Sequence, residues 1–585
     1  MNFMGVSAIG EEVLAAGANL FGGVCVNLPY HPGWGRAQES YGEDPCLLGQ
    51  MGAALVRGVQ SKGVIACVKH FAFNSMENAR LKVNITCDKR TEREVFLPHF
   101  KQCVDAGAGA VMSAYNSYQG TKCGHHAYLL NQVLKSEWEF PGFVFSDFTW
   151  GVTDTMEAAN GGLDMEMPNT CYYGQQLVQA VRDGLVGEEK VDEAAYRIIR
   201  TLLAFQDKIA ESGTCEPDYN RHALLAYRCA AEGITLLKNR DHILPLTCNR
   251  RGKKIVVLGQ LADRENIGDR GSSQVYAPYV VSPLQGIIQA AGGAQVIYYD
   301  GESEAHCRRL AMEADAVIVV TGNDYFDEGE HIEADADAYK IQGYGGDRTE
   351  LGLKERDVKM IEAVAQVRED AVVAIVGGGM IIPGAWRDRV AAILLLYYPG
   401  MEGGTAFADV VFGRKNPGGK LPFVIPRSQQ DMPEMDWDAS EQFYGYFHGY
   451  TWLLANNRKP LYPFGFGLSY TEFQISDLRV ENMDGTVCAS VAVKNTGTRE
   501  GTEVVQMYVG MPHSVVKRPV LILKDFVKVS LRRGEERRVR LTCRPEDMAY
   551  YDETQHAFVT EHTQYDIYVG TSCSLDNLEM RSCMA

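Results

Sequence analysis

A short apolar run that ends in polar residues, followed by an amphipathic stretch, recurs through residues 1–208. Alternation of strand and helix patterns predicts a parallel sheet. The stretches at residues 91–106 and 127–137 have the apolar spacing of helices. Because polar residues gather at the carboxyl ends of several strands, the pattern suits the active-site face of a (β/α) barrel. The strand-like runs are residues 64–68, 110–114, 143–146 and 163–168.

The pattern changes twice along the chain, which at 585 residues is too long for one hydrophobic core. Residues 209–425 contain a linker and then nearly continuous apolar runs, typical of a sheet buried on both faces, so we predict an α/β/α sandwich. Residues 426–472 are rich in Pro, Asp and aromatic residues and are predicted to be a linker. Residues 473–585 alternate apolar and polar side chains, which predicts a β-sandwich of the immunoglobulin or fibronectin type III kind. The apolar runs of the sandwich are 255–258, 296–299, 317–320, 372–376 and 393–396, and the late strands are 488–493, 504–509, 538–543 and 565–569.

Charge, hydropathy and cysteine content limit the partners, cofactors and compartment that we expect for this chain. The formal net charge is -18, so nucleic acid is not an expected partner. No run of about 18 apolar residues occurs, so we expect no membrane span. The 15 cysteines include no C-x-x-C pair, which argues against a zinc site and a disulfide framework. We expect a cytoplasmic protein with free thiols and no metal or organic cofactor, and homo-oligomerisation stays open.

Asp147 is the central candidate for chemistry. It follows the apolar run 143–146, so its carboxylate should face the mouth of a barrel beside aromatic side chains. Asp is also a favoured helix N-cap, and the sequence alone does not separate the two roles. Lys69-His70 ends another run and suits hydrogen bonding to sugar hydroxyls, or a structural salt bridge. Arg36 and Glu39 form either an ion pair that shapes a pocket or a solvated surface pair.

Residues 323–330 are rich in acids and could supply a second carboxyl group beside Asp147, the pair that a reaction such as glycoside hydrolysis needs. This segment leaves the predicted strand 317–320 at its carboxyl end, where ligands of open α/β sheets bind. A solvated acidic loop is the alternative. Gly377–Gly379 also follow a strand but do not match G-x-G-x-x-G, so a nucleotide site has weak support.

Many segments in one order resemble blocks of glycoside hydrolase family 3. The resemblance covers essentially the whole chain. The segments are ESYGEDP (39–45), KHF (69–71), MSAYN (112–116), SDF (146–148), GLDMEMP (162–168), LLKN (236–239), YPGMEGG (398–404), NPGGKLP (416–422) and YPFGFGLSY (462–470).

The resemblance implies a (β/α) barrel, an α/β/α sandwich and a fibronectin type III-like domain, with the site between the first two. It implies a retaining, exo-acting β-glycosidase, with β-glucosidase as the first choice. Asp147 matches the nucleophile. The general acid/base falls in the Asp-Glu-Gly-Glu segment, with Glu328 favoured and Glu330 second. The remaining matches are Arg36, Lys69, His70, Tyr115 and Phe148 for substrate binding, and Asp347-Arg348 for the motif that closes the acidic loop.

One departure from the family pattern lies at the start of the chain. Family members begin the barrel with a strand that carries a sugar-binding Asp-Gly-Pro motif, and no residue before Arg36 matches it. We therefore expect an incomplete barrel whose sheet has an unpaired edge. The alternatives to a β-glucosidase are a β-xylosidase, an α-L-arabinofuranosidase, and a catalytically impaired protein that only binds sugar.

Overall fold

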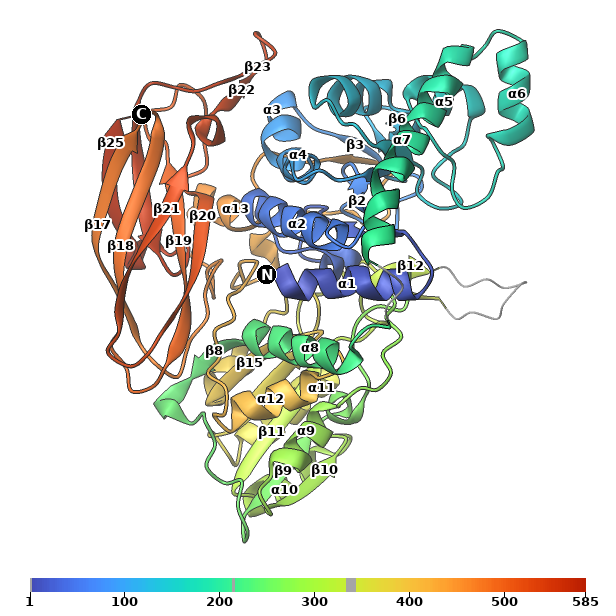
Figure 1. Ribbon diagram of the computed structural model, residues 1–585. Coiled ribbons are helices and arrows are strands. Elements are labelled where there is room, and N and C mark those ends of the chain that lie inside the picture. The colour runs from blue at the N-terminus through green and yellow to red at the C-terminus, as the bar shows by residue number, and fades with distance from the viewer. Residues whose placement is uncertain (1–2, 213–215, 333–342, 585) are drawn as a thin grey trace.

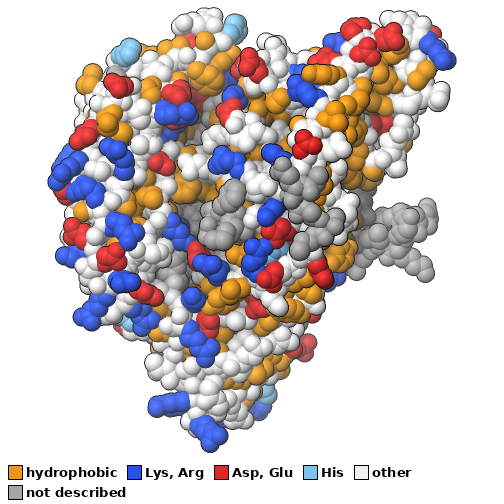
Figure 2. Space-filling view, viewed as in Figure 1, with side chains coloured by type: hydrophobic (Ala, Val, Ile, Leu, Met, Phe, Trp, Pro, Cys, Tyr) orange, Lys and Arg blue, Asp and Glu red, His pale blue; other side chains and the backbone are white. Residues whose placement is uncertain are grey.

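The computed structural model describes residues 3–212, 216–332 and 343–584 and contains three domains (Figure 1). The first ends with helix α7 (Glu188–Ser212), and the second runs from α8 (Tyr219–Gly233) to α12 (Gly403–Val411). The third begins with strand β17 (Phe473–Met483). Acidic and basic side chains are mixed over the face seen in Figure 2. Within the described ranges, no helix has the length and apolar character needed to cross a membrane.

A parallel sheet with the strand order β1-β2-β4-β7 forms the centre of the first domain, as far as the described residues show. Three predicted runs are confirmed as strands β2, β4 and β7. The fourth run, at 163–168, forms only an isolated bridge from Met165 to Phe145. There the Asp164 carboxylate accepts the N–H of Val144, and Pro168 has no N–H to extend a ladder. Among the described residues, β1 and β7 are the two outer strands of this sheet. Its strands are β1 (Leu20–Cys25), β2 (Ile65–Phe71), β4 (Ala110–Ser113) and β7 (Phe143–Phe145).

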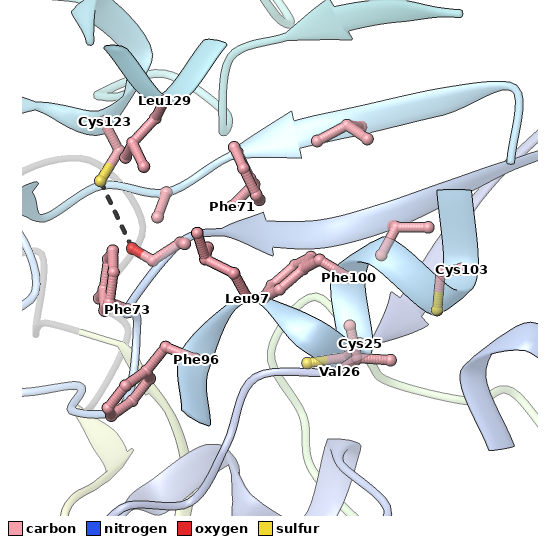
Figure 3. Close-up of a cluster of buried hydrophobic side chains, with 14 of the residues drawn as sticks. Cys25, Val26, Phe71, Phe73, Phe96, Leu97, Phe100, Cys103, Cys123 and Leu129 are labelled. Carbon is pink, nitrogen blue, oxygen red and sulfur yellow. Dashed lines mark hydrogen bonds between the residues drawn. The ribbon is translucent and has the colours of Figure 1, made fainter. Parts of the chain in front are cut away.

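Both faces of this sheet are buried. One face packs on helices α2 (Pro45–Gln60) and α4 (Pro98–Asp105), in a core where Phe71, Phe96 and Phe100 gather (Figure 3). The other face packs on α7 through Phe205. Burial on both sides explains why the strands read as continuous apolar runs. The other α-helices of this domain include α1 (Phe3–Ala15), α5 (Thr155–Gly161) and α6 (Gly174–Arg182).

The two predicted helices of this domain exist, and both include π-helical hydrogen bonding. At the predicted stretch 91–106 the chain forms α3 (Lys89–Thr91), a π-helical turn η2 (Glu92–Phe96) and then α4. The N–H of Leu97 reaches back five residues to Glu92, and Pro98 has no N–H to continue the ladder. Residues 127–137 likewise form a π-helix, η4 (Tyr128–Glu137). Apolar spacing alone cannot separate α from π hydrogen bonding.

The second domain confirms the predicted α/β/α sandwich. Its sheet has the order β10-β9-β11-β14-β15-β8 in the described residues, and β8 is antiparallel to β15. Helices α8, α9 (Pro283–Ala290) and α12 cover one face, and α10 (Glu304–Glu313) and α11 (Glu355–Ala365) cover the other. Each predicted run lies in a strand. The strands are β8 (Thr235–Asn239), β9 (Lys254–Leu258), β10 (Gln295–Tyr299), β11 (Ala316–Gly322), β14 (Val372–Val376) and β15 (Ala392–Tyr397).

Two short segments outside the large sheets connect neighbouring parts of the chain. An antiparallel hairpin, β12 (Gly329–Ile332) with β13 (Tyr344–Gly346), follows the carboxyl end of β11. The segment predicted as a linker holds α13 (Gly449–Ala455) and β16 (Glu441–Phe443). Strand β16 extends a small sheet of the first domain, formed by β3 (Asn84–Thr86), β5 (Ser117–Tyr118) and β6 (Thr121–Lys122).

The third domain confirms the predicted β-sandwich. Within the described residues, one sheet has the order β17-β18-β21 and the other β20-β19-β24-β25. Alternate side chains point into one shared core, as the sequence pattern predicts. The strands are β18 (Thr486–Asn495), β19 (Gly501–Gly510), β20 (Ile522–Leu531), β21 (Glu536–Cys543), β22 (Tyr550–Asp552), β23 (Ala557–Val559), β24 (Gln564–Gly570) and β25 (Glu579–Met584). Short 3-10 turns of the chain lie at η1 (Gly35–Glu39), η3 (Cys123–His125), η5 (Arg240–His242), η6 (Gln260–Asp263), η7 (Ala385–Arg389), η8 (Gln429–Asp431), η9 (Pro545–Met548) and η10 (Leu575–Asn577).

Candidate active site

The carboxyl ends of the parallel strands in the first domain bring polar side chains to one place. Lys69 and His70 lie at the end of β2, Tyr115 follows β4, and Asp147 follows β7. Arg36 joins them from η1, the turn after β1. These side chains are buried, so their charges act on one another with little screening by water.

Asp147 has one bonded and one unbonded carboxylate oxygen. Oδ1 accepts the N–H of Phe148 at 2.8 Å. Oδ2 has no hydrogen-bond partner among the described residues and lies 3.7 Å from Nε2 of His70. Burial raises the pKa of Asp147, while Arg36, the Phe148 N–H, Lys69 and Arg80 lower it in part. The alternative role as a helix N-cap has no support, since α5 is capped by Asp154.

His70 is held in one tautomer by Asn27. The Asn27 amide oxygen accepts the backbone N–H of His70 at 2.7 Å and lies 2.9 Å from its Nδ1, so Nδ1 carries the proton. Burial, together with Arg36, Lys69 and Arg80, holds the pKa of His70 well below its ordinary value. The neutral ring therefore turns the lone pair of Nε2 toward Asp147, where it can accept a hydrogen bond from a hydroxyl group.

Glu39 ties two of the basic side chains together. Its oxygens lie 2.6 and 2.9 Å from Nε and Nη2 of Arg36, and one of them lies 3.5 Å from Nζ of Lys69. The Arg36 and Glu39 side chains are only 1% and 6% exposed, so this is not the solvated surface pair that the sequence left open. A planar bidentate pair fixes the guanidinium, and its Nη2 also donates to the Ser272 hydroxyl at 3.3 Å, so Nη1 is the group left to face a ligand.

Glu330 reaches this cluster from the second domain, on strand β12. Its Oε1 accepts from Nη1 of Arg80 at 2.9 Å and lies 3.9 Å from Nη1 of Arg36, and its Oε2 accepts the N–H of Ser272 at 2.6 Å. The Arg80 guanidinium also lies 5.1 Å from the ring centre of Tyr115. Glu330 therefore shares its basic partners with the residues around Asp147.

Glu328, two residues earlier, has a different environment. Its Oε1 accepts from the N–H of Gly378 and the hydroxyl of Tyr398, both at 2.7 Å. Its Oε2 accepts from Asn323 at 3.1 Å and lies 3.1 Å from Nε of Arg348. The side chain is 2% exposed. Both oxygens are thus occupied by partners within the second domain.

Exposed aromatic side chains lie beside the cluster. Phe148 and Trp150 are 44% and 55% exposed, and the Trp150 ring centre is 6.4 Å from that of Tyr115. The Tyr115 hydroxyl donates to the Phe148 carbonyl at 2.7 Å. Flat apolar rings at the rim suit stacking on a sugar ring. In the described residues, no group of three His, Cys, Asp or Glu side chains is arranged to hold a metal ion.

Sequence reasoning missed Asn27, Arg80 and Ser272, which hold the candidate side chains in place. Asn27 and Arg80 lie in irregular segments after β1 and β2, and Ser272 lies in a loop of the second domain. The i,i+3 spacing of Glu77 and Arg80 is a local sequence signal for an ion pair, but such pairs are common on solvated surfaces and do not indicate a buried site. Their positions depend on contacts between segments far apart in the sequence.

Known proteins resemble the chain along its whole length. Residues 4–201 match the glycosyl hydrolase family 3 N terminal domain, residues 234–470 the glycosyl hydrolase family 3 C-terminal domain, and residues 503–573 the fibronectin type III-like domain. A thermostable beta-glucosidase B of Acetivibrio thermocellus is 35% identical over 97% of this chain and 75% of its own length. An exo-alpha-(1->6)-L-arabinopyranosidase of Bifidobacterium longum is 32% identical over 97% of this chain and 75% of its own length. The crystal structure of a beta-D-glucoside glucohydrolase from Trichoderma reesei superposes with a TM-score of 0.92 at 28% identity, covering 100% of this chain and 88% of that one.

Two family models cover most of the first two domains in the expected order, and the matched segments contain each candidate residue described above. On this evidence the chain belongs to glycosyl hydrolase family 3 and is a glycoside hydrolase.

Proposed function

We propose that this glycoside hydrolase is a retaining, exo-acting β-glucosidase that releases non-reducing terminal β-D-glucosyl residues. The observation that carries the proposal is the unbonded Oδ2 of Asp147, a buried oxygen beside His70 and close to Arg36 and Lys69. Relatives named as beta-glucosidases support the choice of sugar. The neutral substrate is a β-glucoside or a short oligosaccharide.

The proposed reaction is a double displacement. Oδ2 of Asp147 attacks the anomeric carbon, the glycosidic bond breaks, and the leaving oxygen takes a proton from the acid/base residue. Water then attacks the glycosyl-enzyme, gives its proton to the same residue, and frees Asp147 with retention of configuration. Arg36 and Lys69 donate to sugar hydroxyls, and Nε2 of His70 accepts from one. Tyr115 and Phe148 border the reacting carbon.

We assign the acid/base role to Glu330 rather than Glu328. Glu330 shares Arg80 and Arg36 with the pocket, whereas both oxygens of Glu328 are engaged inside the second domain. Burial raises the pKa of Glu330, but Arg36, Arg80 and Ser272 outweigh it and hold the pKa below its usual range. Such a carboxylate is ready as the base of the second step. The first step requires a protonated Glu330, so bound substrate must weaken the contact between Glu330 and Arg80 and allow Glu330 to take up a proton.

The first test is hydrolysis of p-nitrophenyl β-D-glucopyranoside. The unmodified chain should turn the substrate over, and Asp147→Asn should lower kcat on the order of 10⁴-fold or more because no nucleophile remains. Asp154→Asn, which changes the half-buried N-cap of α5, should keep activity. NMR of the first product should show the β-anomer. Release of the α-anomer would rule out the retaining mechanism.

The second test separates the two acids. Glu330→Gln should lower kcat/KM about 10²–10⁴-fold for an alkyl glucoside, whose leaving group needs a proton, and far less for 2,4-dinitrophenyl glucoside, which does not. Glu328→Gln should affect both substrates alike, since it perturbs folding contacts only. The reverse pattern would assign the acid to Glu328.

A second specificity has support from two relatives, each named as an exo-alpha-(1->6)-L-arabinopyranosidase. The exo-alpha-(1->6)-L-arabinopyranosidase of Bifidobacterium longum is nearly as similar as the beta-glucosidase relative, so nitrophenyl α-L-arabinopyranoside belongs in the substrate panel. Nitrophenyl β-xyloside and α-L-arabinofuranoside complete it. Glucose that raises the melting temperature of a chain without turnover would instead identify a sugar-binding protein.

We further propose that the protein works in the cytoplasm. The described cysteines are free, and most of them are buried, as expected for structural thiols in a reducing compartment.

A further inference from the structure

Asp347 directly follows strand β13 of the second domain, yet its carboxylate bonds to the backbone of the first domain. Its Oδ1 accepts the N–H of Gly35 at 3.0 Å, and its Oδ2 accepts the N–H groups of Glu77 and Asn78 at 2.7 and 2.9 Å. Its own N–H donates to the Asn78 side chain at 3.0 Å. These bonds fasten the end of β13 to the turn that carries Arg36 and to the segment that carries Glu77.

The fastened strand is the partner of the strand that carries Glu330. Gly346 of β13 pairs with Gly329 of β12, and Glu330 is the next residue. The hairpin also lies directly against η1, because a Cβ atom at Gly35 would sit 2.3 Å from the Gly346 carbonyl oxygen and 2.4 Å from that of Gly329. A shift of β13 therefore shifts β12 and moves Glu330 relative to Arg36.

A charged carboxylate is well suited to this role. Bonds from backbone N–H groups to an ionised oxygen are shorter and stronger than neutral ones. The Arg348 backbone adds a bond to Gly33 at 2.7 Å, which continues the seam by one residue. Among the described residues, Asp347 makes no hydrogen bond to the Asp147 carboxylate or to a candidate sugar-binding side chain, so its effect on the reaction passes through the backbone segments that it joins, the hairpin among them.

We propose that Asp347 is a positioning residue for Glu330: its carboxylate docks the β12–β13 hairpin onto the first domain, so that the acid/base enters the pocket only when the two domains are engaged. This inference rests on the proposed glycosidase function and on the assignment of Glu330 as its acid/base.

The test compares two substrates on each variant. In Asp347→Ala, kcat/KM for an alkyl β-glucoside should fall at least about 10-fold more than kcat/KM for 2,4-dinitrophenyl β-glucoside, since only the first needs a placed acid. Asp347→Asn keeps one acceptor oxygen, so its ratio of the two kcat/KM values should lie between those of the unmodified chain and Asp347→Ala. The ratio of the two constants does not depend on how much of the variant is folded, so partial unfolding cannot imitate the effect.

Asp409→Ala is the matched control. It removes a carboxylate of the second domain that accepts from Tyr227 at 2.6 Å, away from the hairpin, and should leave the substrate ratio unchanged. Equal losses on both substrates in Asp347→Ala would overturn the inference and leave the proposed function standing. An unmodified chain that hydrolyses neither substrate would overturn the proposed function, and the inference with it.

Discussion

Glu43 is a carboxyl group buried where the first domain meets the segment before the third. Its Oε1 accepts the N–H groups of Val424 and Tyr450 at 3.1 and 2.8 Å. Burial raises its pKa from 4.5 to about 8. Between these values the folded protein holds a proton that the unfolded chain has lost. Stability from Glu43 is therefore full below the unfolded pKa and falls as the pH rises to about 8, by at most about 1.4 kcal/mol per pH unit.

Glu43→Gln tests this residue directly. The amide oxygen can keep both N–H bonds, but the side chain no longer titrates. Its free energy of unfolding in urea should rise relative to the unmodified chain as the pH increases from about 5 to about 8. Glu441→Gln, an exposed change, should give a constant difference. A difference for Glu43→Gln that stays constant with pH would contradict the raised pKa.

The candidate site divides into a part that the sequence predicts and a part that it does not. Lys69, His70 and Asp147 end or follow apolar strands, and parallel strands bring such positions to one edge, so their meeting follows from the pattern. Asn27 and Asp347 act through bonds across more than 40 and more than 260 residues of sequence, respectively. No local pattern encodes a bond of that kind.

At the scale of elements, helices α9 and α12 cross through glycines. A Cβ atom on Gly286 would lie 1.9 Å from the Gly404 carbonyl oxygen. Gly286→Ala should therefore force the helices apart and cost about 1–3 kcal/mol of unfolding free energy in urea. Gly233→Ala, at the end of α8, meets no atom within 4 Å and should be neutral or slightly stabilising. Equal effects of the two changes would show that the crossing tolerates a methyl group.

The elements themselves differ in how well the sequence predicts them. Strands of the second domain read as continuous apolar runs because helices cover both faces of their sheet, and strands of the third domain alternate because one face meets the shared core. The spacing of apolar residues in the sequence is therefore enough to predict both kinds of strand. The same spacing does not predict the π-helical turn η2, because a change from α to π hydrogen bonding leaves the apolar pattern unchanged. It also does not predict that Met165 forms only an isolated bridge, because a side chain that replaces a backbone bond leaves no trace in that pattern.

At the scale of the whole molecule, the Tyr450 hydroxyl joins the first and third domains. It donates to Oδ2 of Asp44, the N-cap of α2, at 2.7 Å and accepts the N–H of Leu523 on β20 at 3.0 Å. The predicted linker that carries Tyr450 therefore acts as an internal packing element. Its short strand and short helix have too few residues for a period to reveal them.

Tyr450→Phe should loosen this junction. The change removes the hydroxyl and leaves a buried carboxylate oxygen and a buried N–H without that partner, at a cost of about 1–3 kcal/mol. If the domains unfold together, calorimetry should show one transition at a lower temperature. Tyr565→Phe removes a hydroxyl bond to the Glu561 carbonyl within the third domain, and is the matched control. Both variants should shift the same transition. A third domain that melts separately, and at an unchanged temperature in Tyr450→Phe, would mean that this hydroxyl does not couple it to the rest of the chain.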